Sequence, residues 1–381
     1  MKKILSLILI ITVPLFTLTG CYTQFGIDKF YYIVALGIDS QENNLLKISI
    51  QTATSSVSAE TSDSSGSSQS SNYKIYSVEA ETIDSGITIL NNYLNKKINL
   101  SHCSALVLSE DLARNDVTPY INALNNNTEL RHSCRLLISS STAYDVLDKV
   151  SNSGEVFSSR LYDYLTNSTS YTGFSIKSTF GNFFQDLEDT HRQPAAIYTK
   201  INNDTIQNFG IAIFKEGKMI GNLDALDTIS HLIVTNELNT CILTIPNPFE
   251  EKGKVDLDIK LYKNTKISIN VINNSPFIEV DIYPEGMIRT SGSKFDYTTN
   301  QNIYKFEEST NNYIENIIND YVYKVTKEYN SDISGFAAKY SSYFLTEKEF
   351  NEAHWNEIFK DSYFKIKVHT RINSSNLFNK Q

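Results

Sequence analysis

The sequence has few cysteines, few histidines and no excess of positive charge. Of its 381 residues, four are Cys and six are His, and 34 Lys and Arg stand against 43 Asp and Glu, so the formal net charge is -9. Four cysteines are too few for a disulfide-stapled fold of this length. A negative chain also lacks the basic field that phosphate contacts require, which excludes a general nucleic-acid binder.

Catalytic signatures are missing as well. The sequence contains no Gly-rich phosphate loop, no Gly-x-Ser-x-Gly elbow, no His-Glu-x-x-His helix and no paired-cysteine metal motif. We therefore predict a protein that is not an enzyme and that carries no cofactor. The hydrophobic share of 41% and the charged share of 20% are typical of a globular protein, and the length allows two or three domains.

The first segment has the pattern of a secretion signal. Two lysines precede an apolar run that ends in Leu-Thr-Gly-Cys at residues 18–21, and the run is shorter than the roughly 20 apolar residues of a spanning helix. Its ending resembles a bacterial lipobox, which implies cleavage between Gly20 and Cys21 and acylation of the Cys21 thiol. We expect a body held by these acyl chains on the outer face of a membrane. The alternative is an uncleaved anchor with an incidental cysteine. No later stretch of the sequence is long and apolar enough to span a bilayer.

The three cysteines downstream are expected to pack inside strands. A disulfide between Cys103 and Cys134 stays open, because both begin strand-like runs that can be neighbours in one sheet. His102 beside the first and His132 near the second raise a metal site as an alternative. Adjacent residues of a strand face opposite sides of the sheet, so these four side chains do not converge on one ion, and we predict no metal.

We predict an elongated, multi-domain α+β protein. Up to about residue 203, helix-period and strand-period segments alternate, which indicates a mixed α/β domain, and a serine-rich stretch within it has almost nothing to bury. A hairpin pattern around Glu216 and Gly217, with positive φ at the glycine, opens a smaller unit. The expected divisions are a signal peptide at 1–20, an N-terminal domain at 21–203 with a disordered Ser-rich loop at 53–72, a small central domain at 204–250, a C-terminal α+β domain at 251–373 and a tail at 374–381.

The C-terminal domain is expected to be an antiparallel sheet packed with long helices. Alternating apolar residues mark strands at 255–261, 267–271 and 278–282, in the pattern of a meander with one wet face. Apolar residues from Ile314 to Val325 form one helical stripe, which we expect to pack on this sheet rather than to bind a partner. A second helix begins at Thr346 with a capping-box pattern.

The last strand alternates apolar residues with the positive side chains Lys365, Lys367, His369 and Arg371. We expect an ordinary solvated sheet face here. A surface that meets acidic lipid or a partner protein is the alternative.

Several short motifs follow one another in a characteristic order. Beside the lipobox they are Leu36–Asp39, the run from His102 to Ala113, Glu129–Arg131, Gly210–Phe214, Lys218–Leu223, Asp332–Phe336, and Trp355 with Phe359 before the final strand. This series resembles the Ger(x)C family, the lipoprotein C subunits of spore nutrient germinant receptors, from Gly20 to about Asn373. The chain departs from the family pattern at Tyr22-Thr23, where Trp-Asp is common.

The resemblance implies a role without chemistry. Proteins of this family are lipid-anchored at the inner membrane of the spore and act beside two membrane-embedded subunits, A and B. The implied function is therefore a non-catalytic receptor subunit needed for germination, held to membrane lipid through acylated Cys21. The alternative from a different class is a lipid-anchored extracytoplasmic protein that binds a small ligand.

Overall fold

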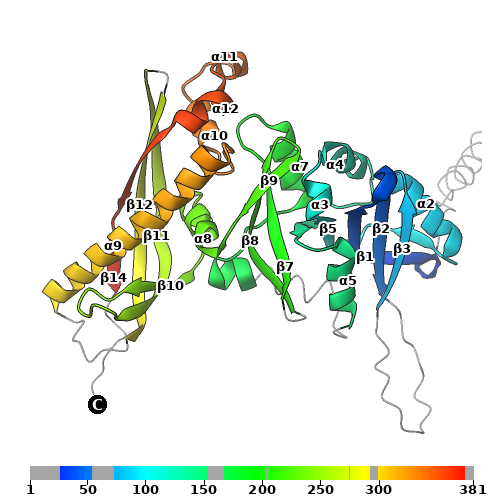
Figure 1. The fold of residues 1–381 in the computed structure, drawn as a ribbon, viewed down its shortest axis with the longest axis horizontal. Helices are drawn as coiled ribbons and strands as arrows, with labels where there is room; N and C mark the ends of the chain where they lie inside the picture. Colours follow the sequence, from blue (N-terminus) through cyan, green and yellow to red (C-terminus); the bar gives the residue numbers. More distant parts are fainter. Residues whose placement is uncertain are drawn as a thin grey trace, which may run out of the picture.

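The fold is built from two β-sheets that lie side by side along the chain's longest axis (Figure 1). A computed structural model describes residues 26–53, 73–152, 167–202, 205–273, 275–291 and 299–373. The expected signal peptide, residues 54–72 of the expected serine-rich loop and the expected tail lie outside these ranges. Among the described helices, none has both the length and the apolar character needed to cross a membrane.

The first sheet has the strand order β3-β2-β1-β5-β6-β7-β8-β9, with β4 also beside β1. Strands β1, β5, β6 and β7 run parallel, and antiparallel hairpins flank them at both edges. The strands are β1 (Phe30–Ser40), β2 (Leu46–Ala53), β3 (Tyr73–Ala80), β4 (Lys97–Asn99), β5 (Ala105–Ser109), β6 (Arg135–Ser139), β7 (Ala195–Asn202), β8 (Thr205–Lys215) and β9 (Lys218–Leu223).

Helices cover both faces of the first sheet, so its central strands are apolar on both sides. Every residue of β5 is buried, as a parallel strand between two helix layers requires. One face carries α2 (Ile83–Tyr93), α3 (Glu110–Ala113), α4 (Thr118–Asn125) and α7 (Phe180–Glu188), and the other carries α5 (Ala143–Asn152). Short single turns are η1 (Ile27–Lys29), η2 (Glu42–Asn44) and η3 (Ser168–Thr172).

The segment expected to form a small central domain, 204–250, contributes to both sheets. Its strands β8 and β9 extend the first sheet, whereas β10 (Cys241–Pro246) pairs with β11 (Lys254–Ile272) of the second sheet. Between them, α8 (Ala225–Val234) is buried along almost its whole length. This segment therefore connects the two sheets.

The second sheet corrects two details of the expected meander. Two of the expected strands, 255–261 and 267–271, form the single long strand β11, which continues through register shifts near Lys263 where its alternation is interrupted. The sheet is also mixed: β10, β11 and β12 (Ser275–Ser291) are antiparallel, but β13 (Tyr363–Val368) and β14 (Arg371–Asn373) run parallel to β12. The long helix between β12 and β13 supplies the crossover that a parallel pair needs.

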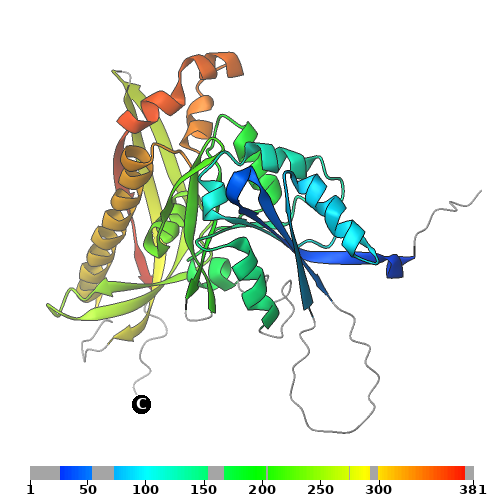
Figure 2. The same ribbon diagram turned by 45° about the vertical axis from the view of Figure 1, so that its right-hand side comes forward.

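That helix, α9 (Asn300–Tyr323), lies across the second sheet and beside α8 (Figures 1 and 2). Its expected stripe is buried at Ile314, Ile318, Tyr321 and Val322, as predicted for a face that packs on the sheet. The chain then continues through η4 (Lys324–Glu328), α10 (Phe336–Ser341), α11 (Glu347–Glu352), α12 (Trp355–Ile358) and η5 (Phe359–Asp361) before β13. The predicted fold class, a multi-domain α+β chain, is confirmed.

A single apolar cluster runs through both halves of the molecule. It includes Leu147 under the first sheet, Leu232 in α8, Ile259 in the second sheet and Trp355 in α12, all of them buried. Burial of apolar surface is the main favourable term in folding, so the two sheets share the interactions that stabilise them.

Candidate functional site

The lipobox residues Gly20 and Cys21 lie outside the described residues, so their role stays a prediction. The first described residue, Gly26, follows Cys21 by five positions, and η1 and the start of β1 lie at one end of the long axis, with the second sheet at the other (Figures 1 and 2). An anchor at Cys21 would therefore hold the molecule by the end of its first sheet.

The Leu-Gly-Ile-Asp motif joins β1 to α5. The carboxylate of Asp39 accepts hydrogen bonds from the backbone N–H groups of Ala143, at 2.5 Å, and Tyr144, at 3.1 Å, which satisfies two free donors at the helix N-terminus. A Cβ on Gly37 would lie 3.2 Å from that of Ala143, so a glycine allows α5 to approach the strand closely. Burial raises the pKa of Asp39. This motif has a structural role.

The structure brings Cys103 and Cys134 together and gives the two histidines different partners. The cysteine Sγ atoms lie 3.9 Å apart, both buried and both thiols, and the Cys103 thiol together with burial raises the pKa of Cys134. His102 packs edge-on against Tyr32, and His132 hydrogen-bonds to another side chain at 3.1 Å. Within the described part of the chain, no group of three metal-binding side chains gathers.

The β8–β9 hairpin forms as predicted, but the positive φ falls on Glu216 at 55° rather than on Gly217. A Cβ on Gly217 would overlap the Asp116 carboxylate and the Thr118 hydroxyl in their present positions, so the glycine lets these two side chains lie close to the hairpin. Glycine at position 217 is therefore explained by the lack of room for a side chain and not by its backbone conformation.

The candidate functional site is the junction between the two sheets, which we define as the segments 189–194, 221–231 and 321–335. Two hydrogen bonds join the first segment to the last: the backbone N–H of Gln193 donates to the carbonyl of Asp332 at 3.0 Å, and the side-chain Nε of Arg192 donates to the carbonyl of Ile333 at 2.9 Å. The buried Ser331 hydroxyl donates to the carbonyl of Phe214 in β8 at 2.6 Å. Strand β8 and the segment before β7 are thus hydrogen-bonded to the chain around the Asp332–Phe336 motif.

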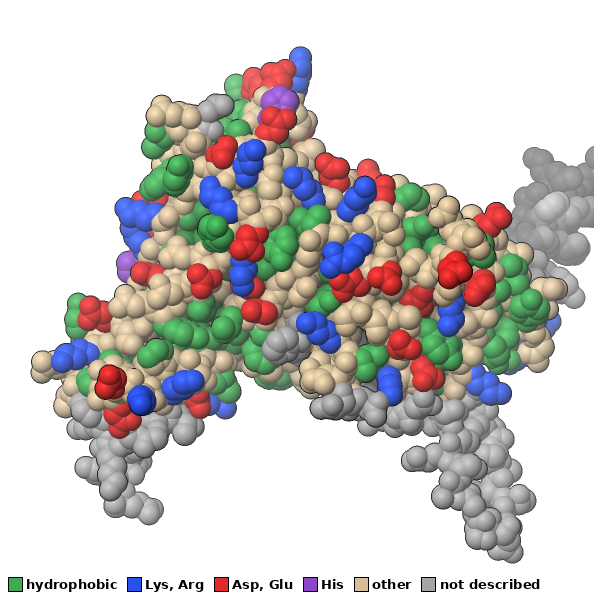
Figure 3. Space-filling model, viewed as in Figure 1, with side chains coloured by type: hydrophobic (Ala, Val, Ile, Leu, Met, Phe, Trp, Pro, Cys, Tyr) green, Lys and Arg blue, Asp and Glu red, His purple; other side chains and the backbone are tan. Residues whose placement is uncertain are grey.

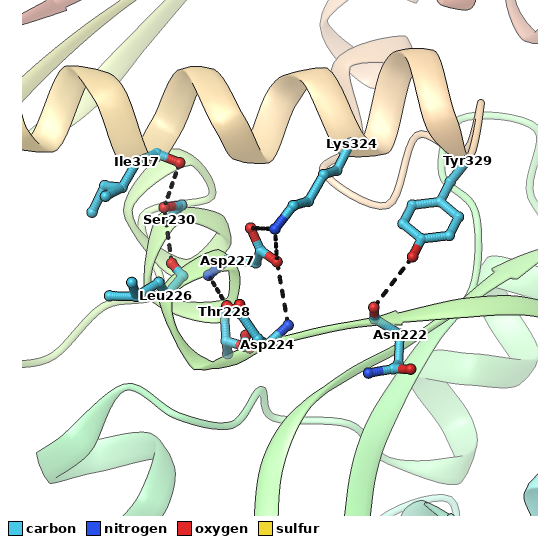
Figure 4. A network of polar contacts seen from close by, with 9 residues as sticks. All are labelled: Asn222, Asp224, Leu226, Asp227, Thr228, Ser230, Ile317, Lys324 and Tyr329. Atoms are coloured by element: carbon cyan, nitrogen blue, oxygen red, sulfur yellow. Dashed lines mark hydrogen bonds and ion pairs between the residues drawn. The ribbon is translucent and has the colours of Figure 1, made fainter.

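A second set of polar contacts joins α8 and β9 to the end of α9 and η4 (Figure 4). Nζ of Lys324 lies 2.7 and 2.9 Å from the two carboxylate oxygens of Asp227, whose side chain is 5% exposed. The Tyr329 hydroxyl reaches the carbonyl of Asn222 at 3.4 Å, and its ring occupies the space in which Gly221 lacks a side chain. Lys218–Leu223 therefore lies against the segment that leads into Asp332–Phe336, although the two are far apart in the sequence.

Buried polar side chains lie in the centre of the junction. Nδ1 of His231 lies 2.7 Å from the Tyr321 hydroxyl, which lies 2.6 Å from the Ser334 hydroxyl. Nε2 of His231 is buried and has no hydrogen-bond partner among the described residues. Burial lowers the pKa of His231 from 6.5 to about 3, and the positive charge of Arg192 makes a smaller contribution in the same direction. The imidazole is therefore neutral at physiological pH.

Asp332 is the buried carboxylate of the same region. It accepts hydrogen bonds from the backbone N–H groups of Phe336, at 3.0 Å, and Ala337, at 2.7 Å, and from Nε1 of Trp355 at 3.0 Å. Burial raises the pKa of Asp332 to about 6. The Asp332–Phe336 motif and Trp355, noted separately in the sequence, thus form one unit that holds α10 and α12 in place.

Acid is expected to destabilise the chain through His231. The unfolded chain binds a proton near pH 6.5 that the folded chain does not bind until about pH 3, so stability is lost as pH falls through this window. The loss is about 1.4 kcal/mol per pH unit. In urea unfolding at pH 7.5 and pH 5.0, the stability advantage of wild type over His231→Gln should shrink by about 2 kcal/mol at the lower pH. An equal advantage at both pH values would show that His231 titrates normally.

Of the four positive side chains expected on the last strand, three lie beside carboxylates and the fourth, Arg371, lies over the ring of Tyr262. Lys365 and Lys367 lie 3.3 and 3.7 Å from Glu279, and His369 lies 3.7 Å from Asp281, both on the neighbouring strand β12. Figure 3 shows the same mixing of both charge signs over the visible face. The ordinary sheet face that we expected is the better description, since carboxylates of β12 accompany three of the four positive side chains.

Comparison with known proteins identifies the class. Residues 26–201 match the family model described as the spore germination protein N-terminal domain, and residues 209–376 match the one described as spore germination B3/GerAC like, C-terminal. The two-sheet fold with its junction is thus that of a spore germination protein. The chain belongs to the spore germination B3/GerAC-like family, and the resemblance read from the motifs is confirmed.

Individual relatives agree with this assignment. YfkR of Bacillus subtilis (strain 168) is 22% identical over 355 residues, which cover 90% of each chain. Spore germination protein B3 of the same organism is 22% identical over 374 residues, or 94% of each chain. The crystal structure of the GerBC protein has the same fold, with a TM-score of 0.59 at 18% identity over 89% of this chain and 96% of that one.

Sequence reasoning missed the contacts that make the junction. No motif in the sequence marks His231, Arg192 or Lys324. One local signal was available: Asp224 and Asp227 form a reciprocal capping box at the start of α8, with the spacing that marks a helix N-terminus. Nothing local indicates that Lys324, 97 residues later, pairs with the second of these carboxylates.

Proposed function

We propose that the chain is a non-catalytic, lipid-anchored subunit of a spore nutrient germinant receptor, which acts by assembling with membrane-embedded subunits. Membership of the spore germination B3/GerAC-like family supports the germination role. The lipobox ending at Cys21 supports the anchor, because acylation there would hold the body at a membrane surface.

The observation that carries the proposal is the continuity of the molecule between its two ends. The apolar cluster shared by both sheets and the polar contacts of the junction connect the anchored end to the second sheet as one body. In such a body, a contact made at one end can change the position of the other end. Restriction to one membrane also raises the effective concentration of subunits toward each other without any new contact.

Replacing Cys21 tests this proposal. A tagged chain recovered from spore inner membranes should bring two polytopic partner proteins with it, and Cys21→Ala should lose most of this recovery together with nutrient-triggered germination, because the tether is gone. Thr23→Ala, which leaves the cysteine in place, is the matched control and should behave as wild type. Recovery of no membrane partner, with normal germination after deletion of the gene, would overturn the proposal and direct the work to small-ligand screening.

A further inference from the structure

A hollow opens at the anchored end of the molecule, between η1, the start of β1 and the end of α2. Its volume is about 830 Å³, and Lys29, Phe30, Leu94, Lys96 and Lys97 are among its lining residues; we call it the basal hollow. Parallel pairing of β4 with β1 places Lys97 beside Phe30. The floor of the hollow is therefore set by strand pairing.

The basal hollow is positively charged in a chain whose net charge is negative. Three lysines line it against one carboxylate, that of Asp28. Within the described ranges, none of the three lysine amino groups forms an ion pair with a carboxylate, in contrast to the paired lysines of the last strand. Their charge is therefore available to an anion from outside.

The hollow holds one of these charges in place. Nζ of Lys96 lies 5.7 Å from the centre of the Tyr31 ring, within the range of a cation–π contact. The Tyr31 hydroxyl donates to Oδ1 of Asn95 at 2.9 Å, which fixes the ring. A second hollow of about 360 Å³ shares Lys97 but contains the carboxylates of Asp84 and Glu129. Of these two hollows, the basal hollow is therefore the one that favours an anion.

Apolar and aromatic side chains accompany the lysines. Phe30 and Leu94 are half-buried in the lining, and the neighbouring Tyr93 is 72% exposed. Aromatic rings with a polar tip and lysines with long apolar stems are the side chains that settle at the boundary between lipid headgroups and acyl chains. The composition of this end therefore matches a membrane surface.

Distance along the chain brings the hollow to the membrane. Cys21 precedes Gly26 by five residues, which span at most about 18 Å even when fully extended. Acyl chains on Cys21 start below the headgroups, and the headgroup layer on one side of a bilayer is about 5–8 Å thick. An anchored chain thus keeps the lysines of the basal hollow within reach of the headgroup layer.

We propose that the basal hollow binds the headgroups of anionic phospholipids in the membrane to which the chain is tethered. This proposal rests on the lipid anchor proposed above and adds a second contact that fixes how the body is oriented on the membrane. The lysines contribute through attraction to anionic lipid, which falls off over about 10 Å at moderate ionic strength.

Vesicle binding of the full mature chain as Cys21→Ala measures this contact without the acyl anchor. Binding to vesicles of phosphatidylcholine with 30% phosphatidylglycerol should be weakened by at least about 30-fold in the variant Lys96→Glu/Lys97→Glu, at about fivefold or more for each lysine. The matched control is Lys252→Glu/Lys254→Glu, which makes the same charge change on two exposed lysines at the start of β11 in the second sheet and should bind as the parent does. If thermal unfolding shows that Lys96→Glu/Lys97→Glu does not fold, Lys96→Gln/Lys97→Gln is used in its place.

Three results would overturn the proposal. They are equal binding to pure phosphatidylcholine vesicles, an equal loss in the control variant, and release by millimolar inorganic phosphate at constant ionic strength, which would indicate a site for free anions. Because the acyl anchor and the receptor partners are absent from this measurement, its failure leaves the pull-down result unaffected. The pull-down can likewise fail while vesicle binding succeeds.

Discussion

Asp332→Ala is expected to lower the free energy of unfolding by about 3 kcal/mol or more, because three buried donors lose their acceptor. These are the N–H groups of Phe336 and Ala337 and Nε1 of Trp355. Each buried donor left without a partner costs about 1–3 kcal/mol, and relief of the buried carboxylate's own desolvation offsets part of the sum. Urea unfolding of the full chain at pH 7.5 measures the loss.

Trp355→Phe is the matched control for this prediction. It keeps an aromatic ring in the site and removes only one of the three donors, so we expect a loss of about 1–2 kcal/mol. Asp332→Asn should be nearly as harmful as the alanine variant. One carboxylate oxygen accepts from both Ala337 and Trp355, so the amide oxygen of Asn would take that position. The amide NH₂ would then replace the other oxygen and face the N–H of Phe336, which is also a donor. A loss below 1 kcal/mol for Asp332→Ala would contradict the assignment of Asp332 as the acceptor of this unit.

The pH dependence of Asp332 opposes that of His231. Burial raises the pKa of Asp332 from 3.8 to about 6, so its folded neutral form contributes stability that is present below pH 3.8 and lost as pH rises through 6. His231 acts in the other direction over an overlapping window. The two slopes partly cancel in the wild-type protein, and the comparison with His231→Gln isolates the histidine.

Gly210→Ala is expected to destabilise the chain by more than 3 kcal/mol. Gly210 has a φ of +122°, a conformation that side-chain-bearing residues rarely adopt, and an added Cβ would overlap the carbonyl oxygen of Leu223 in β9. Both obstacles are in the backbone, so rotation of a side chain relieves neither. Thermal unfolding and the yield of folded protein would show the effect.

Gly217→Ala in the same hairpin is the control. An added Cβ there meets the ends of the Asp116 and Thr118 side chains, which can rotate away, and Gly217 has no positive φ. We expect a loss of about 1 kcal/mol, since moving Asp116 breaks its hydrogen bond to the N–H of Thr118. If the two glycine variants were equally stable, the close approach of β8 to β9 would not be the cause.

Periodicity predicted which residues are buried far better than it predicted what they touch. The stripe on α9 and the helix starting at Thr346 are present as expected, and Thr346 caps α11 through the N–H of Glu349. The prediction that β13 lies antiparallel in its sheet was wrong, since β13 runs parallel to β12. Alternation shows which residues lie on each face of a strand but carries no information on the direction of its neighbour. The continuity of β11 was missed because bulges shift the alternation and imitate a break.

The junction lay beyond sequence reasoning for a related reason. Its contacts join residues separated by about 100 positions or more, such as Lys324 with Asp227 and Arg192 with Ile333. A buried histidine such as His231 is also indistinguishable in sequence from one at the surface. Two of the family motifs nevertheless overlap the junction: Asp332–Phe336 and the end of Lys218–Leu223.

The packing of the Tyr329 ring against Gly221 limits which domains of related proteins can be combined in one chain. Each belongs to a different part of the fold, and the ring of one fills the space left by the other. A chimera that takes its first sheet from one relative and its second from another would carry only one partner of each of three contacts. These are the Gly221–Tyr329 packing, the hydrogen bond from Arg192 to Ile333 and the Lys324–Asp227 ion pair. We therefore expect such a chimera to be less stable than either parent, whereas substitutions at the far ends of the molecule leave these contacts intact.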